Sequence, residues 1–562
     1  MLLSIIRHDL PMVVVALHFI LMSRSQVYAK TDFEGSALDA SNLSWTSCYS
    51  SPLQCSRLTA PLNYSNPNAG SISLALIRIP SPLSGTPSYR GPILFNPGGP
   101  GGSGVQGIAA FGAQIATAVG PEFDVVSFDP RGVGNSTPSI SFFNSDIERA
   151  AFDFGPNQVD AAATPDALPR QWAHFQVLGR LAQDRDNGIL AHVTTDNVAR
   201  DMLHIVEALG QTKLKYWGIS YGSVLGATFA SLFPDKVDRL IIDGLSIHYR
   251  YDLDSDNMLG VLDMEGYYSS NWANEVLDTD KVLQAFFDGC FKAGPKACAF
   301  YDKSPAAISH NLDALYKKVI AQPIVAYSPS LPTYGIIDYA TLKNAVFSSF
   351  YSPYNTFAPL AQGLSDLRNG NGSLLLQLSL PHANEVITAI ACGDAIKITD
   401  DAAGLQKYTE SISNISSFSS LIVATRILCS GWRIHPNNFR GPIKGNTSFP
   451  LLLIGNTADP VAPLSNAIKT SKSFPGSVVL TQDSPGHTSF SIPSECTIGY
   501  IKGYFQNGTL PTAGTVCSVA GDLFPLASTS TARNTVQPRG SVQDVINALR
   551  ISYGDASRVR LF

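Results

Sequence analysis

The sequence predicts an α/β protein in which a mostly parallel, doubly wound sheet carries an inserted helical cap. Three observations support this prediction. Short apolar and β-branched runs alternate with helical segments over residues 71–243. Runs such as VVSFD and LLLIG are continuously apolar, as expected for parallel strands that are covered on both faces. From about residue 251 to 440 helical segments replace the strand pattern, which returns at Phe449.

The strands of the sheet are expected to be short and to be separated by turns or helices. They are Ser71–Ile79, Pro92–Asn96, Phe123–Asp129, Leu214–Ile219, Arg239–Asp243, Leu451–Gly455 and Ser477–Gln482. The clearest helix between them is Asp196–Leu209, because its apolar residues repeat on one face. Thr194-Thr195-Asp196 supplies the N-terminal cap of this helix, and Gly210 ends the helix.

The inserted segment consists of helices that are broken by proline-rich loops, and such an insert usually covers an active site. Its helices are expected at Val282–Lys292, Ala306–Ile320, Tyr339–Phe350 and Ala383–Ala391. We therefore divide the chain into a leader (1–29), a first core part (30–250), the helical cap (251–440), and a second core part with a tail (441–562). The tail contains one short helical stretch, Val542–Ile551.

The N-terminus has the pattern of a secretory signal peptide. Arg7 precedes the apolar run Met12–Met22, which is too short to span about 30 Å of hydrocarbon. Val27 and Ala29 fit a signal-peptidase site, so Lys30 would begin the mature chain. The alternative is an uncleaved anchor. We expect a secreted, extracellular protein that is not held by a membrane after cleavage.

The cysteines agree with export, because disulfides persist in oxidising compartments. None of the 8 cysteines lies in a CxxC pair, so a zinc site is not expected. They form four couples that are local in sequence and are predicted as disulfides, with free buried thiols as the alternative: Cys48–Cys55, Cys290–Cys298, Cys392–Cys429 and Cys496–Cys517. Sequons for N-glycosylation occur at Asn42, Asn63, Asn135, Asn371, Asn414, Asn446 and Asn507.

Length, composition and charge argue against a disordered chain, a single compact domain and a nucleic-acid-binding protein. A chain of 562 residues that is 44% hydrophobic is too apolar to be disordered and too long for one compact domain. The net charge of −5 and the absence of long basic runs argue against nucleic-acid binding.

The sequence GISYG at residues 218–222 places a candidate nucleophile, Ser220, between a strand and a helix. A G-x-S-x-G pentad alone is weak, but this one ends the strand LKYWGI and begins a helical run. Small residues are needed there because the serine takes a strained conformation that crowds its neighbours. The Tyr221 N–H would then face a developing oxyanion.

The remaining members of a serine triad follow in the order Asp, then His. Asp459 comes after the strand LLLIG, and His487 comes after the next strand, SVVLTQ. Three suitable residues at three strand ends favour a Ser220–His487–Asp459 triad over an isolated structural histidine. Asp483 and Asp243 are rival partners for the histidine, although Asp483 lies too near its own strand.

A glycine-rich loop, residues 97–104, follows the strand ILFN and can supply the second oxyanion donor, for which Gly99 is the best candidate. The same residues fit the dinucleotide pattern G-x-G-x-x-G, with Asp129 downstream. Export argues against a nicotinamide cofactor, and the nucleophile turn explains the glycines without one. No cofactor and no metal are expected.

These motifs together resemble those of secreted tripeptidyl aminopeptidases, in the prolyl-aminopeptidase-related branch of the α/β-hydrolases. The matching segments are FNPGGPGGSG, FDPRGVGNS, GISYG, the Asp-Pro pair after LLLIGNTA, SPGHTS and the tail YFQNGTLPTAGTVC. The resemblance covers roughly residues 47–517 and is weaker over the cap, where Ala391–Asp394 resembles the cap-end cysteine segment. Pro97 stands where prolyl aminopeptidases carry a histidine. Arg131 is expected to tie loops together beneath the site.

The resemblance implies a serine peptidase that releases short peptides from free N-termini through an acyl-enzyme. An acid of the cap would have to receive the α-ammonium group, and Glu265 and Asp394 are candidates, together with Asp263 and Glu275. The aromatic residues Tyr267, Tyr268 and Trp272 are expected to pack in the core, and lining a substrate cleft is the alternative. An esterase, lactonase or thioesterase acting on small metabolites is the alternative, since fold and triad do not fix the acyl substrate. A non-catalytic binding module is a third hypothesis.

Overall fold

The computed structural model describes residues 43–153, 166–244, 265–327, 334–379 and 385–525. The predicted signal peptide, the sequon at Asn42, the acid Asp263 and the tail stretch Val542–Ile551 lie outside these residues.

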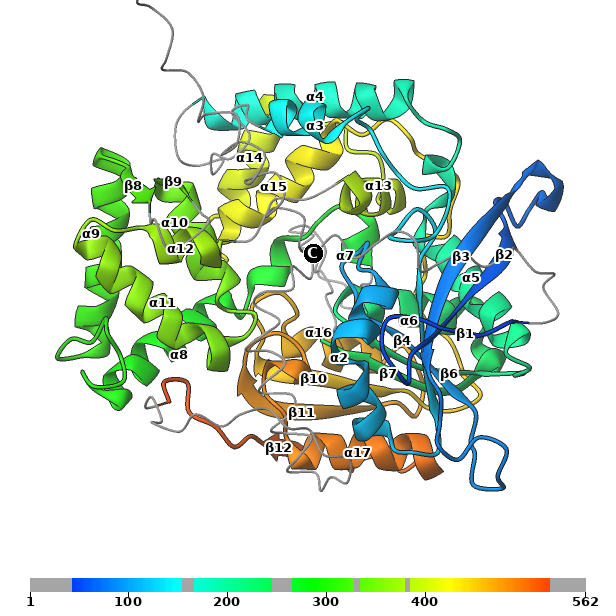
Figure 1. Cartoon of the computed structure of the whole chain (residues 1–562). Coiled ribbons are helices and arrows are strands. Elements are labelled where there is room, and N and C mark those ends of the chain that lie inside the picture. Colours follow the sequence, from blue (N-terminus) through cyan, green and yellow to red (C-terminus); the bar gives the residue numbers. More distant parts are fainter. Residues whose placement is uncertain (1–42, 154–165, 245–264, 328–333, 380–384, 526–562) are drawn as a thin grey trace, which may run out of the picture.

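A ten-stranded sheet forms the centre of the molecule, in the order β1-β2-β3-β5-β4-β6-β7-β10-β11-β12 (Figure 1). From β5 to β12 every neighbouring pair is parallel, whereas β1, β2, β3 and β5 pair antiparallel. The strands are β1 (Thr46–Ser47), β2 (Gln54–Pro61), β3 (Ser71–Ile79), β4 (Pro92–Asn96), β5 (Asp124–Asp129), β6 (Leu214–Ile219), β7 (Val237–Asp243), β10 (Leu452–Ala458), β11 (Val478–Pro485) and β12 (Val516–Ser518).

This sheet confirms the predicted mostly parallel, doubly wound architecture. All seven predicted strands are present, while β1, β2 and β12 lie at the two ends of the sheet and have no clear sequence signal. Helices cover both faces, and the continuously apolar strands are buried between them. One face packs α2 (Gly104–Val119) and α17 (Glu495–Asn507), and the other packs α5 (Thr195–Ala208), α6 (Tyr221–Leu232) and α16 (Leu464–Ser471).

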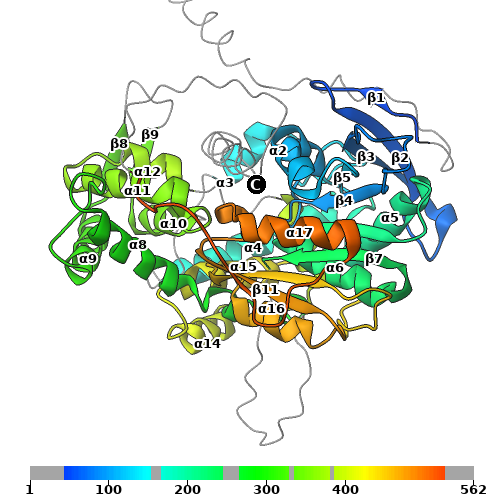
Figure 2. The same ribbon diagram turned by 90° about the horizontal axis from the view of Figure 1, so that it is seen from below.

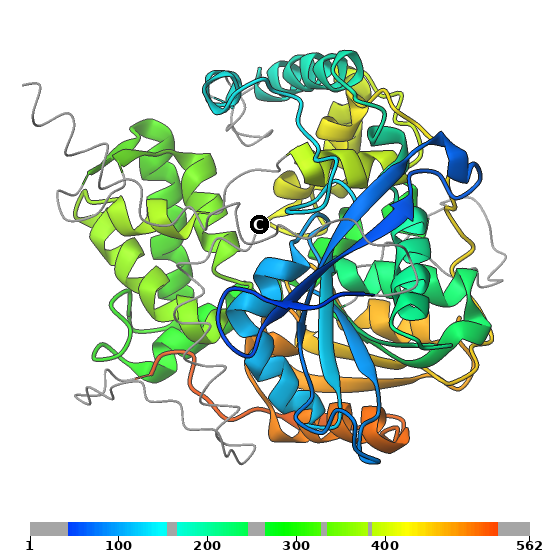
Figure 3. The same cartoon turned by 45° about the vertical axis from the view of Figure 1, so that its right-hand side comes forward.

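A long, mostly helical segment is inserted between β7 and β10. We call residues 279–378 the helical lobe, and Figures 2 and 3 show it beside the sheet rather than within it. It contains α8 (Thr279–Ala293), α9 (Pro305–Ala321), α10 (Tyr339–Ser348), α11 (Pro353–Arg368), α12 (Ser373–Leu378) and a hairpin of β8 (Ile324–Tyr327) and β9 (Tyr334–Ile337). The sequence pattern predicts only helices here. The hairpin forms because one face is buried, at Ala326 and Ile337, while Val325 and Tyr334 on the other face are exposed.

A second helical group follows the lobe. It contains α13 (Glu385–Asp394), α14 (Ala402–Ile412) and α15 (Ser419–Ser430). Two short elements, α7 (Glu265–Tyr268) and the turn Ala273–Val276, come before the lobe in the chain. Helix α4 (Ala167–Asp184) packs against α14 and α15, although it precedes the predicted cap in sequence (Figure 1). A further helix, α3 (Asp146–Asp153), lies near α4 (Figure 1). The predicted cap begins at residue 251, which is outside the described residues, so its limits stay a prediction.

All four predicted cysteine couples are disulfides in the structure: Cys48–Cys55, Cys290–Cys298, Cys392–Cys429 and Cys496–Cys517. Each joins elements that are close in sequence, and Cys392–Cys429 links α13 to α15. Among the residues that the structure describes, no helix is both long and apolar enough to cross a membrane.

Candidate active site

Ser220 occupies a sharp turn between β6 and α6. Its backbone has φ 55° and ψ −127°, a combination that costs energy in a non-glycine residue. The flanking Gly218 is required because a Cβ there would lie 2.2 Å from the carbonyl oxygen of Gly222. The Ser220 N–H donates to the Asp243 carbonyl at 2.9 Å, which ties the turn to the end of β7. The local sequence therefore presents the serine hydroxyl at the carboxyl edge of the sheet.

His487 and Asp459 follow the neighbouring parallel strands β11 and β10 and meet at the same edge. His487 Nδ1 donates to Asp459 Oδ1 at 2.9 Å and Oδ2 at 3.0 Å. Asp459 is fully buried and also accepts the backbone N–H groups of Val461, Ala462 and Thr488. His487 Nε2 is buried and has no hydrogen-bond partner among the described residues. Ser220 is therefore not hydrogen-bonded to His487 in this structure.

Neither rival carboxylate contacts the imidazole of His487 through a hydrogen bond. Asp243 instead accepts from Ser489, through its N–H at 2.8 Å and its hydroxyl at 2.5 Å, and from Trp217 Nε1 at 3.3 Å. Burial raises the pKa of Asp243 to about 6. Asp483 accepts the hydroxyl of Thr457. Asp243 thus links the Ser220 turn to the loop that carries His487.

The glycine-rich loop after β4 lies directly against the Ser220 turn. A Cβ on Gly98 would come within 2.5 Å of the Ile219 carbonyl oxygen and 3.1 Å of the Tyr221 nitrogen, so only glycine allows this approach. The Gly98 N–H is used locally, since it donates to Asn96 Oδ1. Neither the Gly99 N–H nor the Tyr221 N–H donates a hydrogen bond to an acceptor among the described residues. Both therefore remain candidate oxyanion donors.

Asp129 holds the far end of this loop. It is buried, and it accepts the Ser103 hydroxyl at 2.6 Å, the Val105 N–H at 3.0 Å and the Asn135 N–H at 2.7 Å. Asp129, the acidic residue of the dinucleotide pattern, thus binds groups at the start of α2. Arg131, in the next loop, pairs with Asp201 at 2.6 Å and also donates to the Leu62 and His192 carbonyls. It ties loops together as expected.

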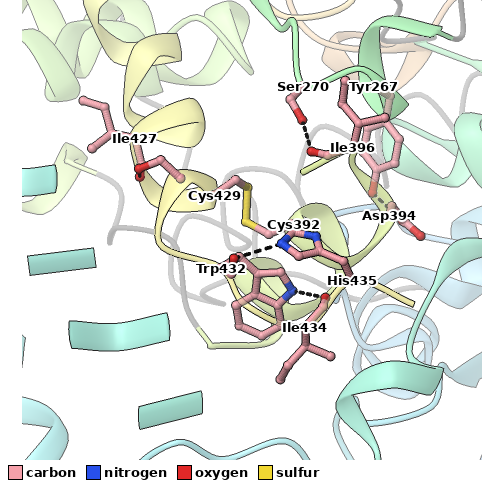
Figure 4. Close-up of a disulfide and its surroundings, with 11 residues drawn as sticks. Tyr267, Ser270, Cys392, Asp394, Ile396, Ile427, Cys429, Trp432, Ile434 and His435 are labelled. Atoms are coloured by element: carbon pink, nitrogen blue, oxygen red, sulfur yellow. Dashed lines mark hydrogen bonds between the residues drawn. A yellow bond between two sulfur atoms is a disulfide. The ribbon is translucent and has the colours of Figure 1, made fainter. Parts of the chain in front are cut away.

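Asp394, one of the candidate substrate-binding acids, lies in a buried network behind Tyr221. Its oxygens accept the Thr195 N–H at 2.8 Å, the Thr195 hydroxyl at 2.5 Å and the Tyr267 hydroxyl at 2.9 Å. Thr195 Oγ1 is in turn 2.5 Å from the Tyr221 hydroxyl. Burial raises the pKa of Asp394 to about 7. Figure 4 shows Tyr267 pointing toward Asp394, close to the Cys392–Cys429 disulfide.

The other candidate acids and aromatics have different surroundings. Glu265 begins α7, and its side chain lies outside what the structure describes. Glu275 is half-buried. Burial of Tyr351 raises the pKa of its hydroxyl, and the negative charge of Glu275 raises that pKa further. Tyr267, Tyr268 and Trp272 are buried in the core, as expected.

Sequence reasoning missed two residues that border this site. Thr195 reads only as part of a helix cap, yet it bridges Asp394 and Tyr221. Tyr351 carries no motif at all, yet its ring lies 5.2 Å from the His487 ring at an interplanar angle of 77°. Contacts between segments so far apart in the chain leave no local signal.

Two family models match the chain. The α/β-hydrolase fold model matches residues 91–289, and a model described as "TAP-like protein" matches residues 415–517. Together with the sheet order, the first match shows an α/β-hydrolase fold.

The chain is also similar to several named proteins. It is 28% identical over 500 residues to serine protease Hip1 of Mycobacterium tuberculosis, covering 84% of this chain and 90% of that protein. It is 29% identical to a tripeptidyl aminopeptidase of Streptomyces lividans, covering 83% and 84%. It is 26% identical to carboxylesterase B of Mycobacterium tuberculosis, covering 86% and 91%.

Proposed function

We propose that this chain, a serine hydrolase of the α/β-hydrolase fold that resembles tripeptidyl aminopeptidases, releases short peptides from free N-termini through an acyl-enzyme. Ser220 is the nucleophile, His487 the general base and Asp459 the residue that orients the imidazole. The observation that carries the proposal is the Asp459–His487 pair, at 2.9 and 3.0 Å, on the strand ends beside a strained serine turn.

The proposed mechanism assigns one role to each of these residues. Asp459 accepts the Nδ1 proton of His487, so the basic lone pair is on Nε2. Nε2 takes the Ser220 proton as Oγ attacks the carbonyl carbon of the scissile bond. The Gly99 and Tyr221 N–H groups then donate to the oxyanion, and His487 returns the proton to the leaving amine. Water hydrolyses the acyl-enzyme by the same steps in reverse order.

In this proposal Asp394 supports the Tyr221 donor rather than binding substrate directly, because its side chain is fully buried and both oxygens accept hydrogen bonds. Glu275 is the better candidate to receive the α-ammonium group. It is half-buried, and its negative charge helps to raise the pKa of Tyr351. The Tyr351 ring packs against that of His487.

The proposed site of action is extracellular, supported by the N-terminal signal pattern and by four disulfides. The sequons at Asn371, Asn414, Asn446 and Asn507 are exposed, Asn63 is half-buried, and the side-chain amide of Asn135 donates to Asp129 at 3.3 Å. We therefore propose the four exposed sequons as the principal glycan acceptors, and Asn135 as the poorest one.

Ester hydrolysis is a second candidate function, favoured by the similarity to carboxylesterase B. The triad and the oxyanion donors serve either acyl substrate. A panel of three substrates separates the two functions: an Ala-Ala-Phe amide with a free N-terminus, its N-blocked counterpart and a simple ester. The aminopeptidase proposal expects turnover of the free peptide amide and a loss of at least about a hundredfold on blocking, because the ammonium contact is lost. Equal turnover of blocked and free amides, or turnover of esters alone, would reject it.

A further inference from the structure

The two loops that carry Asp459 and His487 are both fastened to the helical lobe. Pro460, which directly follows Asp459, accepts the hydroxyl of Thr279 at 2.7 Å. The N–H of His487 donates to the carbonyl of Tyr351 at 3.0 Å. Thr279 begins α8, and Tyr351 lies between α10 and α11, so both partners come from the lobe rather than from the sheet.

The contact at His487 has a second component. The ring of Tyr351 meets the imidazole edge-on, with ring centroids 5.2 Å apart. The preceding residue, Gly486, has φ 111°, and a Cβ there would lie 2.6 Å from the Pro353 ring at the start of α11. The lobe therefore limits the backbone of the histidine loop as well as the plane of its ring.

The nucleophile side of the site is held differently. The Ser220 turn is bonded to Asp243 in the sheet, and Asp129 fastens the glycine-rich loop. Gly101 in that loop faces Val386 of α13, outside the lobe. The serine and the oxyanion donors are thus fixed within the sheet and its neighbouring helices, whereas the base and its orienting carboxylate also depend on the lobe.

We propose that the helical lobe is a positioning element for the acid–base pair, and that Thr279 and Tyr351 are its positioning residues. The inference rests on the proposed triad and adds how that triad is assembled. If the lobe shifts, the Asp459 and His487 loops move with it while Ser220 stays, so proton transfer from Ser220 becomes slower. Misplacement of a catalytic group by a fraction of an ångström to about 1 Å lowers rates by up to about a hundredfold.

Thr279→Val tests this directly, because valine keeps the shape of threonine but cannot donate to Pro460. Thr279→Ser, which restores the hydroxyl, is the matched rescue variant. Ser304→Ala is the control for lobe stability: Ser304 caps α9 by accepting the Ala307 N–H at 3.1 Å, and it contacts neither loop. Tyr351→Leu keeps the backbone carbonyl and removes the ring, and it provides a second test should Thr279→Val fold poorly.

The measurements on the full-length chain are kcat, KM, the pH profile of kcat, the rate of inactivation by a fluorophosphonate, and the melting temperature. We expect Thr279→Val and Tyr351→Leu to lower kcat and the inactivation rate in parallel, by about tenfold or more, with little change in KM. Thr279→Ser should recover most of the rate. Ser304→Ala should lower the melting temperature alone.

The inference is overturned if Thr279→Val and Tyr351→Leu inactivate within twofold of the wild-type rate, whatever their melting temperatures. It is also overturned if Thr279→Ser is as slow as Thr279→Val. Persistent fluorophosphonate labelling of Ser220→Ala is a different outcome, because it rejects the proposed triad itself.

Discussion

The candidate active site, at the carboxyl edge of the sheet, and the helical lobe are held together by different kinds of contact. At the site four buried carboxyl groups, Asp129, Asp243, Asp394 and Asp459, each fasten a separate loop or turn by accepting hydrogen bonds. In the described part of residues 279–378 no carboxyl side chain is buried, and the core consists of aromatic and aliphatic side chains.

The two kinds of contact indicate which part of the molecule fixes the positions of the catalytic groups and which part contributes most to the free energy of unfolding. A carboxylate that accepts two or three hydrogen bonds holds its donors in defined directions, but burying it costs free energy. Apolar packing is favourable but much less directional. We therefore expect changes at the carboxyl groups to affect catalysis most, and changes in the lobe core to affect stability most.

The largest expected effect is on catalysis and comes from Asp459. Asp459→Asn should lower kcat by about 10⁴-fold, because the amide favours the wrong imidazole tautomer. Asp243→Asn is the matched comparison and should cost about tenfold, since it loosens the His487 loop without contacting the imidazole. Steady-state kinetics on one peptide amide compares the two. Equal losses in both variants would mean that the two carboxylates share the orienting role.

The next effect is on the lobe core. Leu312 of α9 is buried, and Leu312→Ala should lower the free energy of unfolding by about 3 kcal/mol through the cavity that it leaves. Urea denaturation measures this change. The rate of fluorophosphonate inactivation below the transition should stay near that of the wild type. A variant of unchanged stability would show that the lobe core is not packed as described.

A loss of similar size is expected in the second helical group, outside the lobe. The Cys392–Cys429 disulfide joins α13 to α15 next to Asp394 (Figure 4). Replacing both cysteines by serine should lower the free energy of unfolding by about 3 kcal/mol, because the unfolded chain regains freedom. Thermal unfolding of the double variant, with the Cys290–Cys298 pair replaced as the control, checks the result. No loss at Cys392–Cys429 would contradict it.

The smallest expected effect is the pH dependence that Asp394 contributes. Burial raises its pKa to about 7, so between the ordinary carboxyl range and pH 7 the folded chain binds more protons than the unfolded chain at this residue. The wild type should therefore gain stability relative to Asp394→Asn as the pH falls from 8 to 5. The slope should approach about 1.4 kcal/mol per pH unit. A pH-independent difference, or one of opposite sign, would contradict this assignment.

Much of the fold could be predicted because its signals are local. Continuous apolar runs predict β5, β7 and β10. The glycines around Ser220 predict a sharp turn, because only residues without a Cβ fit there. The pairing of His487 with Asp459 was also predictable, because both residues follow neighbouring parallel strands.

The parts that escaped prediction depend on contacts between distant segments. Helix α4 joins α14 and α15 across more than two hundred residues of sequence. The burial of Asp394 depends on Thr195 and Tyr267, which come from two other elements. One of the two contacts between Tyr351 and His487 is made by the Tyr351 backbone carbonyl, which any residue type would provide, and the other is made by the Tyr351 ring.

In the proposed mechanism Ser220 is a nucleophile that His487 and Asp459 activate. Labelling of the full-length protein with a fluorophosphonate, followed by mass spectrometry of the digested chain, tests this role. We expect one adduct, on the peptide that contains Ser220, with labelling abolished in Ser220→Ala and strongly slowed in His487→Ala. An adduct on another residue, or undiminished labelling of Ser220→Ala, would contradict it.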